Sequence, residues 1–157
     1  MTPASDSVTV TVTVDTDPAT AFALFTGETD RWWRRGPKFR VAGKRPGIVR
    51  FEPHAGGRLL EEFDSEVVET GRITLWDPPA RFTFEWRAGT LVDVRFDAVP
   101  TGTRVTVRHS GWAAVPADAP VRHGQQGAAF IRQIGLWWAD LLTGYREQNL
   151  GTDTTFH

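Results

Sequence analysis

His109 carries the side chain in this sequence that is best suited to acid–base chemistry, because an unperturbed imidazole titrates near neutral pH. It precedes Ser110 and follows Val105 and Val107, which alternate with polar residues. The alternation predicts a strand that turns His109 to the same face as the two valines. There the imidazole would orient a ligand or transfer protons, or it would be a neutral, buried group hydrogen-bonded to backbone. The sequence leaves these roles open.

Other catalytic chemistries find no matching pattern. The four histidines, at positions 54, 109, 123 and 157, lack the spacing of paired metal ligands, and cysteine is absent. No Gly-x-Ser-x-Gly motif surrounds a serine, and the glycine-rich stretches lack the pattern of a phosphate-binding loop. We therefore predict no metal and no cofactor, and we assign no catalytic residue.

A basic segment offers a second candidate chemistry, anion binding. Residues 31–50 carry eight positive and no negative charges, which leaves −9 for the rest of a chain whose total is −1. A planar guanidinium can hold a carboxylate or phosphate by two hydrogen bonds, so Arg34, Arg35 and Arg40 are candidates for an anion site at a pocket mouth. Alternatively, the segment pairs with the acidic hairpin at 61–69. The small total charge argues against a nucleic-acid partner.

A sheet and a long helix must position these residues. Alternating hydrophobicity predicts strands at 8–14, 48–52, 58–63, 67–76, 82–86, 91–99 and 103–109, the last six as an antiparallel meander. A short helix begins at Asp17-Pro18 and ends near Gly27, and a second short helix carries Trp32 and Trp33. Apolar residues at helical spacing predict a long amphipathic helix over 123–150. The expected fold class is α+β, with a curved sheet of about seven strands wrapped on the long C-terminal helix.

The alternation also predicts which side of the sheet faces the helix. Charged and polar residues share one face of the last three strands, and the apolar set shares the other: Phe82, Phe84, Trp86, Val92, Val94, Phe96, Val105, Val107 and His109. We expect the apolar set to face inward. Ile73 and Leu75 are expected to join it, with Gly71 as a candidate β-bulge.

The inner face and the helix carry more large aromatic side chains than one helix packed on a sheet requires. These side chains either form a packed core or line a cavity, because ligand pockets are mostly apolar with few polar groups. In the second case we expect ligand contacts from the following residues: Phe51, Phe84, Trp86, Phe96, Val107, His109, Trp112, Phe130, Ile134 and Trp138.

Length and composition fit one domain. The chain has 157 residues, 40% of them hydrophobic, so we expect a single domain over 1–157 with its core at 8–150. No apolar run approaches the roughly 18–20 residues of a membrane-spanning helix, and the N-terminus lacks the apolar core of a signal peptide. We therefore expect a cytoplasmic protein without membrane insertion.

An ordered set of short motifs connects the chain to a known superfamily. The motifs are Gly56-Gly57-Arg58, Trp76-Asp77-Pro78-Pro79 followed by Arg81, then Trp86, Gly102-Thr103 and His109-Ser110-Gly111-Trp112. Together they resemble the SRPBCC (START-like, helix-grip) superfamily. Within it they are most similar to the bacterial branch that resembles the C-terminal domain of the activator of the heat-shock-protein-90 ATPase. The resemblance covers roughly residues 8–150.

The resemblance implies a seven-strand sheet that grips a long helix, usually with an apolar cavity between them. Three functions follow from it: binding of a hydrophobic or amphipathic small molecule (lipid-like, aromatic or polyketide-like), catalysis similar to that of polyketide cyclases or aromatases, and a co-chaperone-like interaction. We favour the first, because such enzymes need several positioned polar groups and the inner face offers His109 and at most one glutamate. The expected partner is a small hydrophobic molecule, and a homodimer stays open.

Overall fold

The computed structural model describes residues 7–86, 89–115 and 127–154. Its elements are, in chain order, β1 (Ser7–Val14), α1 (Pro18–Gly27), α2 (Thr29–Trp32), β2 (Ile48–Phe51), β3 (Arg58–Phe63), β4 (Glu66–Asp77), β5 (Arg81–Trp86), β6 (Thr90–Val99), β7 (Gly102–Ser110), the short 3₁₀ helix η3 (Trp112–Ala114) and α3 (Gly127–Thr154). This order confirms the predicted α+β meander with two short helices after the first strand. Trp33 lies one residue beyond α2, in extended backbone. The predicted start of the long helix, at 123–126, lies outside the described residues.

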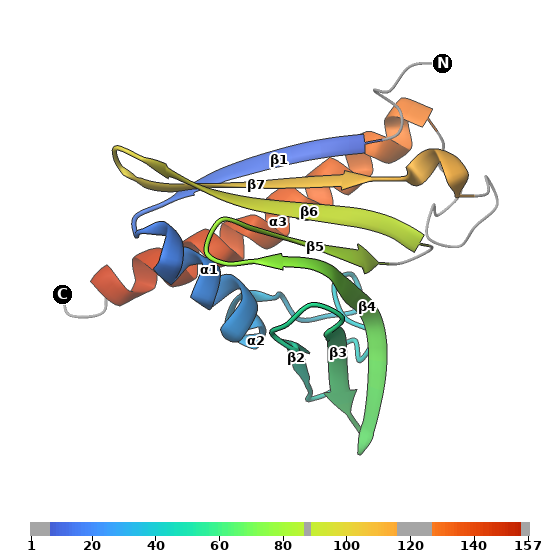
Figure 1. The fold of residues 1–157 in the computed structure, drawn as a ribbon. Coiled ribbons are helices and arrows are strands. Elements are labelled where there is room, and N and C mark those ends of the chain that lie inside the picture. The colour runs from blue at the N-terminus through green and yellow to red at the C-terminus, as the bar shows by residue number, and fades with distance from the viewer. Residues whose placement is uncertain (1–6, 87–88, 116–126, 155–157) are drawn as a thin grey trace.

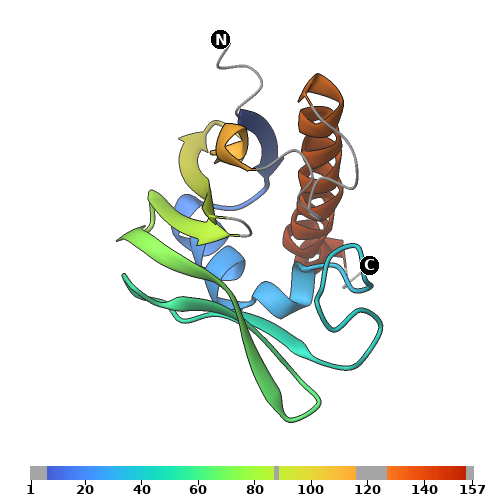
Figure 2. The ribbon, with the colours of Figure 1, turned by 90° about the vertical axis from the view of Figure 1, so that its right-hand side faces the viewer.

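The seven strands form one antiparallel sheet in the order β1-β7-β6-β5-β4-β3-β2. Figure 2 shows this sheet curling around α3, with α1 and α2 on the same concave side. The curl turns at β4, whose first half pairs with β3 and whose second half pairs with β5 (Figure 1). The predicted wrapping of a curved sheet on the long helix is therefore confirmed. Within the described part of the chain, every helix falls short of the length or the apolar character that crossing a bilayer requires.

The apolar face of the sheet is the face that the alternation predicts. On β6, Val92, Val94 and Phe96 are buried, whereas Arg95 and Asp97 between and beyond them are exposed. Strand β7 follows the same rule in register with β6, and β5 does so except at Thr83, which is buried although it lies on the polar face. Burial of this face against the helices supplies the main stabilisation of the fold, because apolar area removed from water contributes about 25 cal/mol per Å².

The prediction for Leu75 is wrong, because β4 contains two irregularities rather than one. Thr70 is an extra residue opposite β3, next to the expected position, and Thr74 is an extra residue opposite β5. Each extra residue shifts the side-chain alternation by one position. Ile73 is therefore buried while Leu75 is 39% exposed. Trp76 takes its place on the inner side, with its ring 5.1 Å from that of Phe22.

Gly71 lies at the turning point of β4, and we predict that Gly71→Ala destabilises the protein. A Cβ atom built at this position would lie 2.5 Å from the carbonyl oxygen of Glu85, so β4 and β5 would have to separate. We expect a loss of about 1–3 kcal/mol in the free energy of unfolding, measured by urea denaturation. Gly27→Ala at the end of α1 is the control, because no atom lies within 4 Å of its Cβ position. Equal stability of the two variants would contradict this account.

Candidate functional site

Four tryptophans meet between α3 and the sheet. Trp137 and Trp138 come from α3, Trp86 ends β5, and Trp33 follows α2. The Trp86 ring lies 5.1 Å from Trp137 and 5.9 Å from Trp138, measured between ring centroids, and Trp33 lies within 6.4 Å of all three. Trp137 is half-buried and the other three are buried. We call these four residues the tryptophan cluster.

His109 connects the tryptophan cluster to the sheet through a directed chain of hydrogen bonds. The indole N–H of Trp138 donates to Nδ1 of His109 at 3.0 Å, and Nε2 lies 2.7 Å from Oγ1 of Thr90. An indole nitrogen can only donate, so Nδ1 is the acceptor and the proton of the neutral ring is on Nε2. Nε2 therefore donates to Thr90, whose hydroxyl donates to the carbonyl of Trp86 at 3.2 Å.

The environment of His109 keeps its imidazole neutral. The side chain has no exposed surface, and burial lowers its pKa to about 3. Protonation would also place a second N–H directly against the indole N–H of Trp138. Both ring nitrogens are already engaged, so the arrangement matches the neutral buried role and provides no general base at physiological pH.

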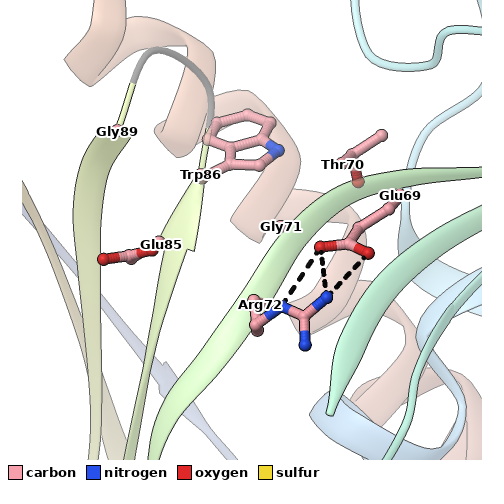
Figure 3. Close-up of a pocket in the computed structure, with 7 residues that line it drawn as sticks. All are labelled: Glu69, Thr70, Gly71, Arg72, Glu85, Trp86 and Gly89. Atoms are coloured by element: carbon pink, nitrogen blue, oxygen red, sulfur yellow. Dashed lines mark hydrogen bonds and ion pairs between the residues drawn. The ribbon is translucent and has the colours of Figure 1, made fainter. Parts of the chain in front are cut away.

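A hollow of about 300 Å³ reaches the tryptophan cluster where β4 bends away from the end of β5. Its walls are Glu69, Thr70, Gly71, Arg72, Glu85, Trp86 and Gly89. Figure 3 shows the indole of Trp86 on the side of α3, while Arg72 and Glu69 face each other along β4. The Arg72 guanidinium lies 3.0 Å from both carboxylate oxygens of Glu69. The hollow thus combines an aromatic wall with a charged rim.

The residues predicted to contact a ligand fall into two groups. Trp86 and Trp138 belong to the tryptophan cluster, and His109 contacts both. Trp112 packs on His109, and Phe130 and Ile134 pack on the far cluster that contains Trp112. The other four, Phe51, Phe84, Phe96 and Val107, are buried deeper in the core. Phe51 packs on Phe82 and Phe84, and Phe96 packs on Phe22 and Phe25 of α1. Of these ten residues, Trp86 is the one that lines a hollow described here.

Arg40 does not fit the predicted anion site, because its side chain points inward. It is 3% exposed and binds the Asp30 carboxylate through Nη1 at 2.7 Å. Its Nε donates to the carbonyl of Arg34, and Nη2 donates to the carbonyls of Asp30 and Trp33. The guanidinium is therefore committed to holding the segment after α2, and we withdraw Arg40 from the anion site.

Arg34 and Arg35 line a second hollow, of about 230 Å³, between α2 and α3. Arg34 pairs with Asp140 at 3.0 Å and Arg35 pairs with Asp30 at 3.3 Å. Their side chains are 34% and 58% exposed, so both stay accessible to a solute. Trp33 lines this hollow too, so the hollow adjoins the tryptophan cluster, of which Trp33 is a member.

The basic segment also pairs with the acidic hairpin, as the alternative interpretation predicts. Arg45 binds Asp64 and Arg50 binds Glu62, each at 2.7 Å. Glu61 is 5% exposed and accepts hydrogen bonds from the backbone N–H groups of residues 41 and 42. The basic segment is therefore held by ion pairs with Asp30 of α2 and with the acidic hairpin at 61–69.

The expected ligand contacts omit three aromatic residues of this site: Trp33, Phe39 and Trp137. Phe39 is 6% exposed and its ring lies 5.4 Å from that of Trp137. The sequence does indicate that Phe39 is unusual, because it is a large apolar residue in a segment rich in glycine and positive charge. Such a residue needs a buried place, but the sequence does not say where.

The curled sheet around a single long helix is the helix-grip (START-like) architecture, and the chain can be assigned within it. Residues 15–134 match the family model described as activator of Hsp90 ATPase homolog 1-like protein, and the chain belongs to this family. The resemblance drawn from the short motifs is therefore confirmed. A search of curated proteins found no match.

Several solved structures share the fold. A Mesorhizobium loti protein is 17% identical with a TM-score of 0.63, and the match covers 93% of this chain and 97% of that one. An AHSA1-like protein of Aeromonas hydrophila is 18% identical with a TM-score of 0.62, covering 94% and 93%. The Aha1 dimer of Colwellia psychrerythraea is 13% identical with a TM-score of 0.62, covering 90% and 93%. At these identities the likeness concerns the fold.

We predict that His109 makes the protein less stable in mild acid. The unfolded chain binds a proton near pH 6.5 and the folded chain near 3, so stability falls as the pH drops below 6.5 and is unaffected by this group above it. Between pH 7.5 and 5.0 wild type should lose about 2 kcal/mol more than His109→Gln, at roughly 1.4 kcal/mol per pH unit. Urea denaturation at both pH values measures this.

His54→Gln is the control for that comparison, because the side chain of His54 is exposed and its ring bonds only the neighbouring carbonyl of residue 55 among the described residues. It should keep the pH dependence of wild type. If His109→Gln and His54→Gln lose the same free energy of unfolding between pH 7.5 and 5.0, His109 is not a neutral buried imidazole.

Proposed function

We propose that this protein binds a hydrophobic or amphipathic small molecule against the tryptophan cluster, between the sheet and α3. The observation that carries the proposal is the hollow of about 300 Å³ whose inner wall is the Trp86 ring. Trp86 is 7% exposed and contacts two further tryptophans of α3. An apolar group entering the hollow would therefore meet the ring of Trp86, which the tryptophans of α3 support from behind.

The composition of the hollow favours an amphipathic molecule over a purely apolar one. Arg72 and Glu69 form an exposed ion pair at its rim, with side chains 52% and 39% accessible. Exposed ion pairs contribute little to stability, about 0.2–1 kcal/mol, so a polar group of a ligand can replace one partner at small cost. Ligand sites commonly combine an apolar wall with a few polar groups of this kind.

The cyclase or aromatase alternative is less well supported. His109 contacts the tryptophan cluster directly through Trp138, and it is neutral with both nitrogens engaged. A proton-transfer role would require breaking its bond to Thr90 or to Trp138. We therefore assign His109 a structural role beneath the binding surface.

N-phenyl-1-naphthylamine, a neutral dye whose fluorescence rises in apolar surroundings, tests the proposal. We expect micromolar binding with one dye per chain, and about tenfold weaker binding to Trp86→Leu, which removes the aromatic wall. The matched control is Trp76→Leu. Trp76 is also mostly buried, but it lines a different apolar groove, together with Pro78 and Pro79. Fluorescence titration gives the affinities.

Dye binding that responds to Trp76→Leu and not to Trp86→Leu would move the site to the groove beside α1 and contradict the proposal. No dye binding to folded wild type would contradict it as well. Native mass spectrometry of the purified protein adds an independent measurement, because a co-purified hydrophobic molecule would identify the ligand class.

Arg34 and Arg35 are proposed to attract a negatively charged group on the ligand. We predict that Arg35→Gln weakens binding of 1-anilinonaphthalene-8-sulfonate by roughly two- to fivefold, the range expected of an exposed charge pair. N-phenyl-1-naphthylamine has the same rings without the sulfonate, and its affinity should not change. Arg45→Gln is the control for total charge, since Arg45 pairs with Asp64 away from this hollow. Equal effects of the two variants would remove Arg35 from the site.

A further inference from the structure

The segment Gly36–Gly43 is a loop that closes on itself. The N–H of Gly36 donates to the carbonyl of Gly43 at 3.1 Å, so the two ends of the loop meet. Both glycines have positive φ, +104° and +66°. Glycine adopts such angles at no steric cost, so Gly36 and Gly43 give the backbone freedom to turn at the two ends of the loop.

The tip of this loop inserts an aromatic ring beside the tryptophan cluster. Phe39 is 6% exposed although it belongs to no helix or strand. Its ring lies 5.4 Å from that of Trp137 with 36° between the planes, and Trp137 in turn lies 5.1 Å from Trp86 at 40°. Phe39 thus continues a row of aromatic rings that the protein's fixed elements begin.

Different kinds of interaction hold the tip and the base of the loop. The base is tied to two carboxylates: Arg40 binds Asp30, and the N–H groups of residues 41 and 42 bind the buried Glu61. The tip is held by two indole N–H groups, from Trp33 to the Phe39 carbonyl at 2.9 Å and from Trp137 to the carbonyl of residue 38 at 2.8 Å. The charged contact at the tip, Lys38 with Asp140, is 3.7 Å long and exposed.

We propose that Phe39 is a built-in plug, and that the place its ring fills takes a flat aromatic ring of the ligand. The inference rests on the proposed function and names the ligand class for it. The ligand displaces Phe39, residues 37–39 swing outward from Gly36, and residues 40–42 stay anchored to Asp30 and Glu61. The apparent affinity is lowered by the fraction of molecules in which the loop is open.

The geometry of the rings selects a flat aromatic ligand. Phe39 packs against the indole ring of Trp137 at 36° between the planes. An aromatic ring of a ligand in the same place gains an attraction beyond its buried area. A saturated ring of equal size gains only the buried area. We therefore expect 1-naphthol to bind roughly two- to tenfold more tightly than decahydro-1-naphthol.

Calorimetric titration of the full chain with 1-naphthol tests the plug. Phe39→Ala leaves the place empty, so binding should become about tenfold tighter, as expected when roughly a tenth of wild-type molecules have the loop open. Phe39→Leu keeps an apolar side chain in the core, so its affinity for 1-naphthol should increase less than that of Phe39→Ala. Val41→Ala is the control, because Val41 belongs to the same loop and is 46% exposed. Its affinity should equal that of wild type.

Hydrogen exchange of the indole N–H groups tests the same motion in wild type without any substitution. Saturating 1-naphthol should speed the exchange of Trp33 and Trp137, whose acceptors move away with the loop. Trp138 donates to His109 instead and should stay protected.

The outcomes separate the two proposals. If wild type binds 1-naphthol but Phe39→Ala binds it no more tightly, or if the indoles of Trp33 and Trp137 keep their protection, the plug is overturned and the proposed function stands. If neither wild type nor Phe39→Ala binds 1-naphthol or N-phenyl-1-naphthylamine, the proposed function and the plug are both overturned.

Discussion

The hydrogen-bond chain from Trp138 through His109 and Thr90 to the Trp86 carbonyl joins α3 to three strands of the sheet. Its direction depends on one proton, the one on Nε2 of His109, because the indole can only donate. An imidazole is suited to this position since its two nitrogens donate and accept at opposite sides of one ring. A buried polar group is costly unless it is paired, so the chain fixes where α3 lies on the sheet as well as adding stability. The tryptophan cluster forms around this fixed contact.

Two carboxylates, the partly exposed Asp30 and the buried Glu61, order the long irregular connection between α2 and β2. The Asp30 carboxylate binds the Arg40 guanidinium at 2.7 Å and accepts a hydrogen bond from the N–H of Val49 at 3.0 Å. One side chain therefore links the connection to β2, the edge strand of the sheet. Glu61 does the same from β3 by accepting two backbone N–H groups. A connection without its own ladder of hydrogen bonds must satisfy its backbone groups in another way. The positive charges of this segment therefore hold the connection in place through ion pairs, in addition to any role in binding a ligand.

The shape of β4 links the fold to the proposed site. The extra residues Thr70 and Thr74 bend the strand between its pairing with β3 and its pairing with β5. Gly71 lies between them, and the absence of a side chain there allows the close approach to β5. The bend opens the hollow in front of Trp86 (Figure 3). The same irregularities that curl the sheet around α3 thus leave an aromatic surface within reach of a small molecule.

The amino-acid sequence by itself determined the succession of strands and helices, the α+β class and the inner face of the last three strands. The reason is that these features follow from a local period of two or 3.6 residues. The period fails for Leu75, because a single extra residue at Thr74 reverses the alternation and no local pattern marks it.

Only the tertiary structure decided how the site residues combine. His109 meets partners 19 and 29 positions away, Arg40 turns inward to Asp30, and Phe39 reaches Trp137 from a loop nearly a hundred residues earlier. Residue type indicates that an imidazole, a guanidinium or a phenyl ring needs a partner. Which partner it obtains depends on how the curled sheet brings distant segments together.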